Sequence, residues 1–210
     1  MTGPVTVGAD PTWGSLIVLS GPSSAGKTTL AAALQHSFAA DDQCWFVYAM
    51  DDYLGRIPFD WVTAGAHVGR NAEDGVLLDV VDGEFELRMG PIGRQVLRAW
   101  RGAVGSAVRS GLHVIADEVV LTEADWDGWQ QELAGVDAHW VRVHADLEVL
   151  EDRERERGDR LPGQARAQYE DAHRHPTYAA SVDTGAMGAE EAAVAVRRGW
   201  QARRRAGAAG

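Results

Sequence analysis

One short loop constrains the fold of this chain more than any other feature. Residues 21–28 read Gly-Pro-Ser-Ser-Ala-Gly-Lys-Thr, a full match to the Walker A pattern GxxxxGK[ST], and they include the only lysine of the sequence. The apolar run 16–20 before the loop is typical of a buried parallel strand, and the alanine- and leucine-rich run after it is typical of a helix. Strand, loop and helix together predict a site for a nucleoside triphosphate.

Each part of this loop has an expected task. Backbone N–H groups of residues 23–28 should hold the phosphates at the helix N-terminus, where the helix dipole favours an anion. The Lys27 ammonium should bind phosphate oxygens, which a planar guanidinium cannot do in the same space, and the Thr28 hydroxyl should bind Mg²⁺. The predicted nucleotide contacts are Gly21, Ser23, Ser24, Ala25, Gly26, Lys27, Thr28, Thr29 and, from a later segment, Arg153.

Composition narrows the class of protein. With 210 residues, of which 45% are hydrophobic, the chain suffices for one α/β domain but not for two. A net charge of −11 disfavours nucleic acid as a partner. The single cysteine, Cys44, excludes an internal disulfide, and its apolar, strand-like surroundings predict a core position. Because the chain lacks both an apolar stretch of about 20 residues and a secretion signal, we expect a soluble cytoplasmic protein without a membrane partner. A homo-oligomer is left open.

Strand and helix patterns alternate along the chain. Besides 16–20, strands are expected at 43–50, 112–116, 138–144 and 181–183, and helices at 91–110, 123–134, 146–157 and 189–204. This order predicts an α/β fold with a parallel five-stranded sheet covered by helices on both faces. We expect a single domain over 15–205, with a segment covering the acceptor at 52–92 and a lid at 153–166, between a flexible lead-in (1–14) and a frayed tail (206–210).

Carboxylates follow two of the predicted strands. Asp117 and Glu118 end the strand near 114, the arrangement in which an aspartate orients Mg²⁺, although acidic pairs are also common in turns. Asp51 ends the second strand, where a kinase needs a base for the acceptor hydroxyl. The alternative is that either Asp51 or Asp52 simply caps the next turn, a role that suits Asp52 in particular. We assign Asp117 to the metal, Asp51 to catalysis and Glu118 to the acceptor.

A cluster of arginines lies after the fourth strand. Arg153 and Arg157 share one face of the predicted helix, and Gly158 releases the chain into a lid that carries Arg160. Guanidinium groups over a triphosphate would neutralise the charge on the transferred group, so Arg157 and Arg160 are predicted to be catalytic. The alternative is a solvated helix in which neighbouring glutamates balance the arginines.

Taken together, these motifs resemble the chloramphenicol phosphotransferases and related small P-loop kinases. The resemblance spans about 16–184 and rests on 21–28, Asp51, Gly90-Pro91 with Arg94, Leu97, Ala99 and Trp100, Asp117-Glu118, Arg153-Glu154, 157–160 and 182–184. It implies a nucleoside-kinase-like P-loop fold, ATP or GTP with Mg²⁺, and Asp51 as the base that activates a hydroxyl of the acceptor. It also brings Arg94 into the acceptor site.

The predicted acceptor wall departs from the family. Asp52, Tyr53 and Leu54 follow Asp51 where the family has a small polar and then an aliphatic residue. Apolar side chains suited to a flat or greasy ligand are Tyr53, Ile57, Phe59 and Trp61, with core packing as the competing account. Six carboxylates and no cation lie between 73 and 86. Such a wall would suit a cationic or many-hydroxyl acceptor, whereas a solvated loop is the alternative.

The sequence therefore predicts a kinase that transfers the γ-phosphoryl of ATP or GTP to a hydroxyl of a small natural product, as in antibiotic inactivation or self-resistance. One alternative is a kinase of a primary metabolite, such as a sugar acid or nucleoside. Another is a nucleotide-regulated switch, which would usually carry an NKxD segment; the single lysine already lies in the phosphate-binding loop.

Overall fold

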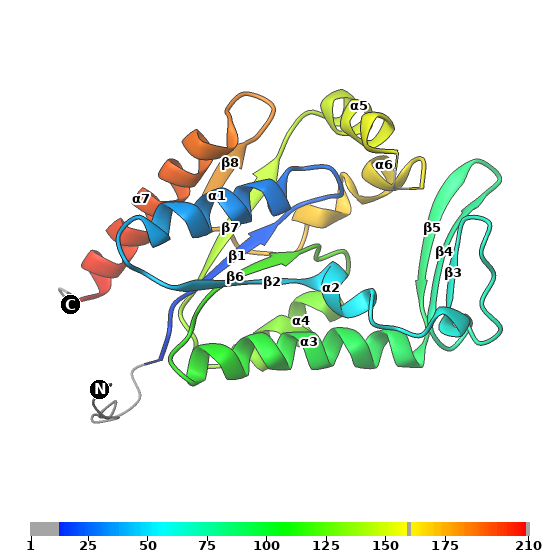
Figure 1. The fold of residues 1–210 in the computed structure, drawn as a ribbon, viewed down its shortest axis with the longest axis horizontal. Coiled ribbons are helices and arrows are strands. Elements are labelled where there is room, and N and C mark those ends of the chain that lie inside the picture. Colours follow the sequence, from blue (N-terminus) through cyan, green and yellow to red (C-terminus); the bar gives the residue numbers. More distant parts are fainter. Residues whose placement is uncertain (1–12, 159–160, 209–210) are drawn as a thin grey trace, which may run out of the picture.

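The main sheet has five parallel strands, as the sequence predicts. The computed structural model describes residues 13–158 and 161–208. Across the sheet the strand order is β2 (Trp45–Ala49), β6 (His113–Glu118), β1 (Leu16–Ser20), β7 (Ala138–His144) and β8 (Ala180–Asp183). Every neighbouring pair is parallel, so the carboxyl ends of all five strands share one edge (Figure 1).

Helices cover both faces of this sheet. Figure 1 shows α1 (Lys27–Ala39) and α7 (Ala189–Ala208) on one face, and α3 (Pro91–Arg109) and α4 (Glu123–Glu132) on the other. All five β1 side chains are buried between the two layers, as a central parallel strand requires. Trp100, Trp129 and Trp140 are buried in the core cluster on the α3–α4 side, and Trp200 is buried in the cluster on the α1–α7 side.

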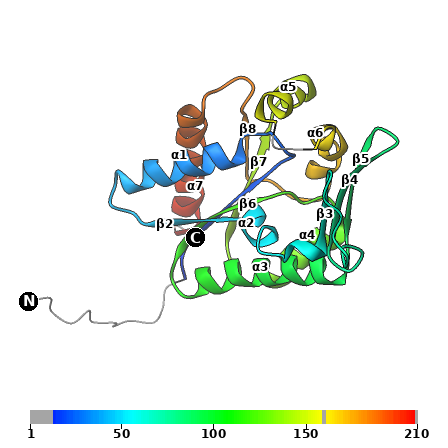
Figure 2. The ribbon, with the colours of Figure 1, turned by 45° about the vertical axis from the view of Figure 1, so that its right-hand side comes forward.

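A second, smaller sheet was not predicted. It consists of β3 (Val62–Ala64), which pairs in parallel with β4 (Val76–Val81), and β5 (Glu84–Met89), which forms an antiparallel hairpin with β4. Asp82 and Gly83 join the hairpin with φ angles of 53° and 86°, the left-handed conformation that a two-residue turn needs. Figure 2 shows this sheet beyond the carboxyl ends of the main sheet, next to the start of α3.

Short elements follow β2 and β7 of the main sheet. After β2 come α2 (Met50–Leu54) and the 3₁₀ turn η1 (Phe59–Trp61). After β7 come α5 (Leu147–Arg157), α6 (Gln164–Gln168) and the 3₁₀ turn η2 (Asp171–His173). The Tyr178 hydroxyl anchors η2 near the end of β1, because it lies 3.0 Å from His173 Nδ1 and 3.3 Å from Ser20 Oγ.

One position differs from the expected core. Cys44 is exposed, because β2 begins one residue later, at Trp45, whose ring takes the inward position and stacks on Phe38 with a centroid separation of 4.2 Å. None of the helices in the described part of the chain is long and apolar enough to cross a membrane.

Candidate active site

The phosphate-binding loop connects β1 to α1 in a conformation that its residue types permit. Gly26 has a φ of 80° and Ser24 a φ of 63°, and α1 begins at Lys27. Gly21 must be glycine, because a Cβ there would lie 2.1 Å from the carbonyl oxygen of Val143. The loop therefore wraps over the N-terminus of a helix that has no acidic residue in its first turn, an arrangement that favours an anion.

Lys27, Thr28 and Asp117 meet at the carboxyl edge of the sheet. Asp117 lies opposite Leu19 of β1 and Ala49 of β2 in the strand register. The Thr28 hydroxyl donates a hydrogen bond to Asp117 Oδ2 at 2.7 Å, and Lys27 Nζ lies 3.8 Å from Asp117 Oδ1. Lys27 Nζ also donates to the Pro22 carbonyl at 3.0 Å. The geometry thus joins the three side chains that the sequence assigns to phosphate and metal.

The Thr28–Asp117 pair fits Mg²⁺. A hydroxyl and a carboxylate side by side are the hard oxygen donors that this ion prefers, and Mg²⁺ commonly takes only one or two protein ligands beside phosphate oxygens and water. Asp117 is 8% exposed, so the carboxylate is shielded from bulk solvent but open toward the cavity that it lines.

Arg153 supports the loop from behind. Its guanidinium donates to the Ser24 carbonyl at 3.3 Å, to Thr184 Oγ1 at 3.0 Å and to the Thr184 carbonyl at 2.7 Å. Thr184 Oγ1 in turn donates to the Ala25 carbonyl at 2.9 Å. The predicted nucleotide contact Arg153 therefore makes hydrogen bonds with protein groups that hold the loop against the end of β8, and Ala25 is buried beneath this clamp.

Beside the clamp is a small cavity of about 350 Å³. It opens between the loop, α5 and the segment that leads into α7, and its lining comprises Ser24, Gly26, Thr29, Leu30, Arg153, Arg157, Thr184, Met187, Gly188 and Ala189. The lining thus combines two arginines with the apolar residues Leu30, Met187 and Ala189.

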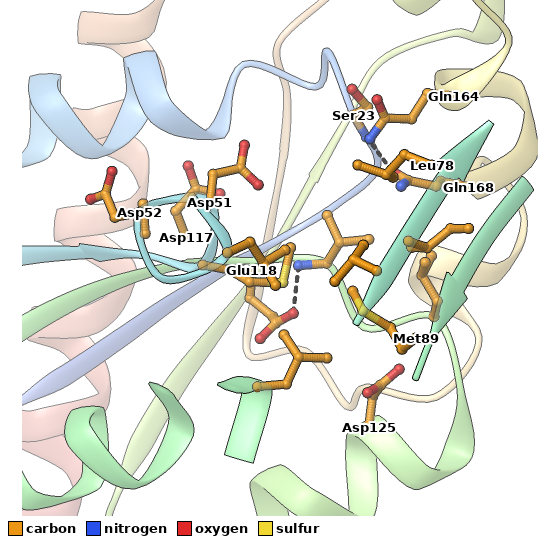
Figure 3. A pocket seen from close by; sticks show the side chains of 18 of the residues that line it. Ser23, Asp51, Asp52, Leu78, Met89, Asp117, Glu118, Asp125, Gln164 and Gln168 are labelled. Carbon is orange, nitrogen blue, oxygen red and sulfur yellow. Dashed lines mark hydrogen bonds between the residues drawn. The ribbon is translucent and has the colours of Figure 1, made fainter. Parts of the chain in front are cut away.

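A larger cavity of about 1280 Å³ lies in front of the loop. Figure 3 shows Asp51, Asp52, Asp117 and Glu118 on one side of it and the hairpin residues Leu78 and Met89 on another. Of the residues predicted from the sequence, its lining contains Ser23, Ser24, Gly26, Lys27, Thr28, Thr29, Asp51, Ile57, Phe59, Arg94, Asp117, Glu118 and Arg157. Phosphate-binding groups and candidate acceptor groups thus share one chamber.

The hairpin gives this cavity an apolar roof. The face made of Val76, Leu78, Phe85, Leu87 and Met89 lines it, and all five are aliphatic or aromatic. Asp79 and Glu86 are paired on the opposite face, and none of the six carboxylates between 73 and 86 is among the cavity's described lining residues. Arg88, 3.9 Å from both Glu73 and Glu86, balances part of their charge. Of the two interpretations of this acidic segment, the structure therefore favours a solvated outer face over an acidic wall of the acceptor site.

Two predicted acceptor contacts lie elsewhere. Tyr53 does not line the cavity; it packs on the α3–α4 core cluster, because α2 turns it inward, and the Arg56 guanidinium lies 5.4 Å from its ring centroid. Trp61 is half-buried and also lies outside the lining, since it follows the η1 turn into β3. Phe59 does line the cavity but is 72% exposed.

Glu118 forms a buried polar cluster at the inner end of the cavity. Its carboxylate accepts hydrogen bonds from Trp129 Nε1 at 3.0 Å and from the Val119 N–H at 2.9 Å. Arg101, close by, pairs with Asp125 at 2.7 Å. Burial raises the pKa of Glu118 to about 8, and the Arg101 guanidinium partly opposes this rise. The carboxyl is therefore largely protonated at neutral pH, which suits a residue that binds an acceptor better than a base.

This raised pKa makes stability depend on pH. Between pH 4.5 and about 8 the Glu118 carboxyl holds its proton in the folded protein but loses it in the unfolded chain, so the contribution of Glu118 to the free energy of unfolding falls as pH rises through that window. We expect Glu118→Gln to flatten this slope in denaturant unfolding measured at several pH values, whereas the exposed control Glu123→Gln retains it. Equal slopes for wild type and Glu118→Gln would contradict the raised pKa.

Only part of the predicted arginine lid falls within the described residues, and the lid itself stays a prediction. Arg157 is the last residue of α5, is exposed and lines both cavities, and Gly158 follows in a left-handed conformation with a φ of 66°. Arg155 is exposed and pairs with Asp152 of the same helix. Arg160 lies outside the described residues, so its role stays a prediction.

Solved structures of two kinases have a similar fold. The structure of APS kinase CysC from Mycobacterium tuberculosis, in complex with AMPPNP and APS, is similar with a TM-score of 0.63 and 16% identity, covering 91% of this chain and 99% of that one. A gluconokinase from Sinorhizobium meliloti 1021 is similar with a TM-score of 0.55 and 19% identity, covering 89% and 91%. The fold is that of the P-loop kinases.

Sequence comparison identifies the family. Residues 14–201 match the family described as Chloramphenicol phosphotransferase-like protein, and this chain belongs to it. The chain is also 32% identical over 192 residues to a protein of Mycobacterium tuberculosis (strain CDC 1551 / Oshkosh) named Putative O-phosphotransferase MT2714, covering 90% of this chain and 83% of that protein. The protein is a phosphotransferase with a P-loop kinase fold, as the motifs indicate.

Proposed function

We propose that this protein transfers the γ-phosphoryl group of ATP or GTP, bound with Mg²⁺, to a hydroxyl of a small natural product. The observation that carries the proposal is that Asp51 lines the same chamber as Lys27, Thr28 and Asp117. Ala49 is the register partner of Asp117, and Asp51 lies two residues after Ala49 in the chain. The candidate base therefore lies beside the phosphate-binding edge of the sheet (Figure 3).

In this mechanism Asp51 accepts the proton of the acceptor hydroxyl as its oxygen bonds to the γ-phosphorus. The bond between that phosphorus and the oxygen bridging to the β-phosphate breaks, and the nucleoside diphosphate leaves. Lys27 and the loop N–H groups hold the phosphates, and Arg157 balances charge on the transferred group. Thr28 and Asp117 would hold Mg²⁺, which would supply neutralisation of the negative charge on the phosphates.

The acceptor chemistry follows from the cavity walls. The five apolar hairpin residues facing the chamber favour an acceptor with an apolar face, and the polar side chains of α3 and α4 on the other side favour hydrogen-bonding groups. An amphipathic natural product such as an antibiotic suits these walls better than a sugar acid that is polar on every side. We propose the cytoplasm as the location, because nucleoside triphosphates are available there.

A screen of acceptors tests this function. Purified protein with Mg²⁺ and either ATP or GTP is mixed with hydroxylated antibiotics, nucleosides and sugar acids, and diphosphate release is measured with mass spectrometry of each acceptor. We expect stimulated release together with one added phosphate on an amphipathic natural product. Stimulation by sugar acids or nucleosides alone would favour a metabolite kinase, and release without any phosphorylated acceptor would favour a nucleotide switch.

A further inference from the structure

A buried glutamine on α6 touches the phosphate-binding loop. Gln168 is 4% exposed, and its Oε1 accepts a hydrogen bond from the Ser23 N–H at 2.8 Å (Figure 3). Ser23 belongs to the phosphate-binding loop, so α6 contacts this loop directly, and in this structure the Ser23 N–H, which the sequence predicts to hold phosphate, donates to Gln168. No part of the Walker A pattern anticipates this contact.

The hydrogen bond determines which end of the Gln168 amide faces the site. Because the oxygen faces an N–H donor, the NH₂ group lies on the other branch of the side chain. Within the described part of the chain this NH₂ group donates no hydrogen bond to protein, although Gln168 lines the large cavity. Gln164, one helical turn earlier, lines the same cavity.

The position of Gln168 is fixed from both sides. Glu154 of α5, 6% exposed, accepts hydrogen bonds from the N–H groups of Gly163 and Ala165, each at 2.7 Å, and so caps the start of α6. Beyond Gln168, the Tyr178 hydroxyl holds η2 through its hydrogen bond to the Ala172 carbonyl at 3.2 Å. A side chain held in this way loses little entropy when a ligand arrives.

The polar group that α6 directs toward the phosphate-binding loop is the neutral amide of Gln168 and not a charged side chain. The arginine of this helix, Arg166, is exposed and pairs with Glu151 at 2.7 Å, on the side away from the loop. A neutral donor in the cavity that Lys27 also lines adds a hydrogen bond for a phosphate oxygen without the repulsion that another cation would suffer there.

We propose that the Gln168 NH₂ group donates a hydrogen bond to the terminal phosphate of the bound triphosphate, and that Gln168 thereby positions the γ-phosphoryl group while its oxygen holds Ser23. This inference rests on the proposed function. The Gln168 hydrogen bond would distinguish a triphosphate from a diphosphate, because this contact is lost when the γ-phosphoryl group has left.

Two substitutions separate this role from a purely structural one. Gln168→Glu keeps an oxygen for the Ser23 N–H but removes the donor, and Gln168→Met removes both without adding charge. Affinity is measured by calorimetry for a non-hydrolysable triphosphate and for the matching diphosphate, alongside thermal unfolding. Gln130→Glu, at an exposed position outside the cavity lining, controls for the added charge.

We expect both Gln168 variants to lose triphosphate affinity by a factor of about 10 or more while diphosphate affinity changes much less, as removal of a hydrogen bond to a charged group implies. Gln130→Glu should behave as wild type. The inference is overturned if Gln168→Glu keeps the wild-type preference for triphosphate, or if Gln168→Met weakens both nucleotides equally. A wild-type protein that binds no nucleotide would instead overturn the proposed function.

Discussion

Replacing Lys27 with methionine is expected to abolish phosphoryl transfer and leave the fold intact. Lys27 is only 9% exposed, and methionine fills nearly the same space as this side chain but cannot bind phosphate oxygens. Losing a preorganised charge of this kind costs a factor of about 10²–10³ or more in turnover. Steady-state turnover measures the loss, and thermal unfolding verifies the fold, which should be retained because the Lys27 ammonium contacts only Pro22 and Asp117 among the described residues.

Two further variants define the limits of this expectation. Lys27→Arg should also be inactive, because the broader guanidinium does not fit the loop that now holds the ammonium 3.0 Å from the Pro22 carbonyl. Arg203→Met, which removes a surface cation paired with Asp137, should retain full turnover. Substantial activity in the arginine variant would contradict the role assigned to Lys27.

Replacing Asp51 with asparagine should separate transfer from nucleotide binding. The substitution keeps the size of the side chain but removes the base, so transfer to the acceptor should fall by about 10²–10⁴, whereas triphosphate and Mg²⁺ should still bind. Turnover with the acceptor and calorimetric nucleotide affinity are measured on the same preparation. The neighbouring Asp52→Asn, on the same short helix α2, provides the matched comparison and should lose far less. Reversed effects of the two variants would move the base to Asp52.

Local patterns were sufficient to predict the main sheet and its phosphate edge. A run such as 16–20 is buried on both faces in a parallel sheet, and the loop after it has a fixed sequence, so each can be identified without knowledge of the rest of the chain. Asp117 and Asp51 could be located because parallel strands place their carboxyl ends at one edge.

The β4–β5 hairpin, which forms the apolar roof of the large cavity, could have been predicted from the sequence. Asp82-Gly83 followed by alternating charged and apolar residues from Glu84 to Met89 is a hairpin signal, but the density of carboxylates directed attention to a solvated loop. The hairpin and the solvated acidic segment are two faces of the same strands, β4 and β5. Their carboxylates lie on the outer face, and their apolar side chains line the cavity.

Other features depend on tertiary contacts that no local pattern encodes. Tyr53 and Trp61 are aromatic and near Asp51 in sequence, yet the turns of α2 and η1 decide which neighbours face the cavity. Arg153 matches a family motif, but its guanidinium donates to Ser24 and Thr184 of two distant loops. The contact between Gln168 and Ser23 spans 145 positions and has no sequence signature.

The central claim is that the γ-phosphoryl group moves to a hydroxyl of the acceptor in the chamber shared by Asp51 and the phosphate-binding loop. The most direct measurement uses a triphosphate labelled only in its γ-phosphoryl oxygens and follows the label by mass spectrometry in wild type and Asp51→Asn. We predict that wild type transfers the label to the acceptor and that the variant leaves it almost entirely on the nucleotide. Label found only in inorganic phosphate with wild type, whatever acceptor is supplied, would contradict the claim.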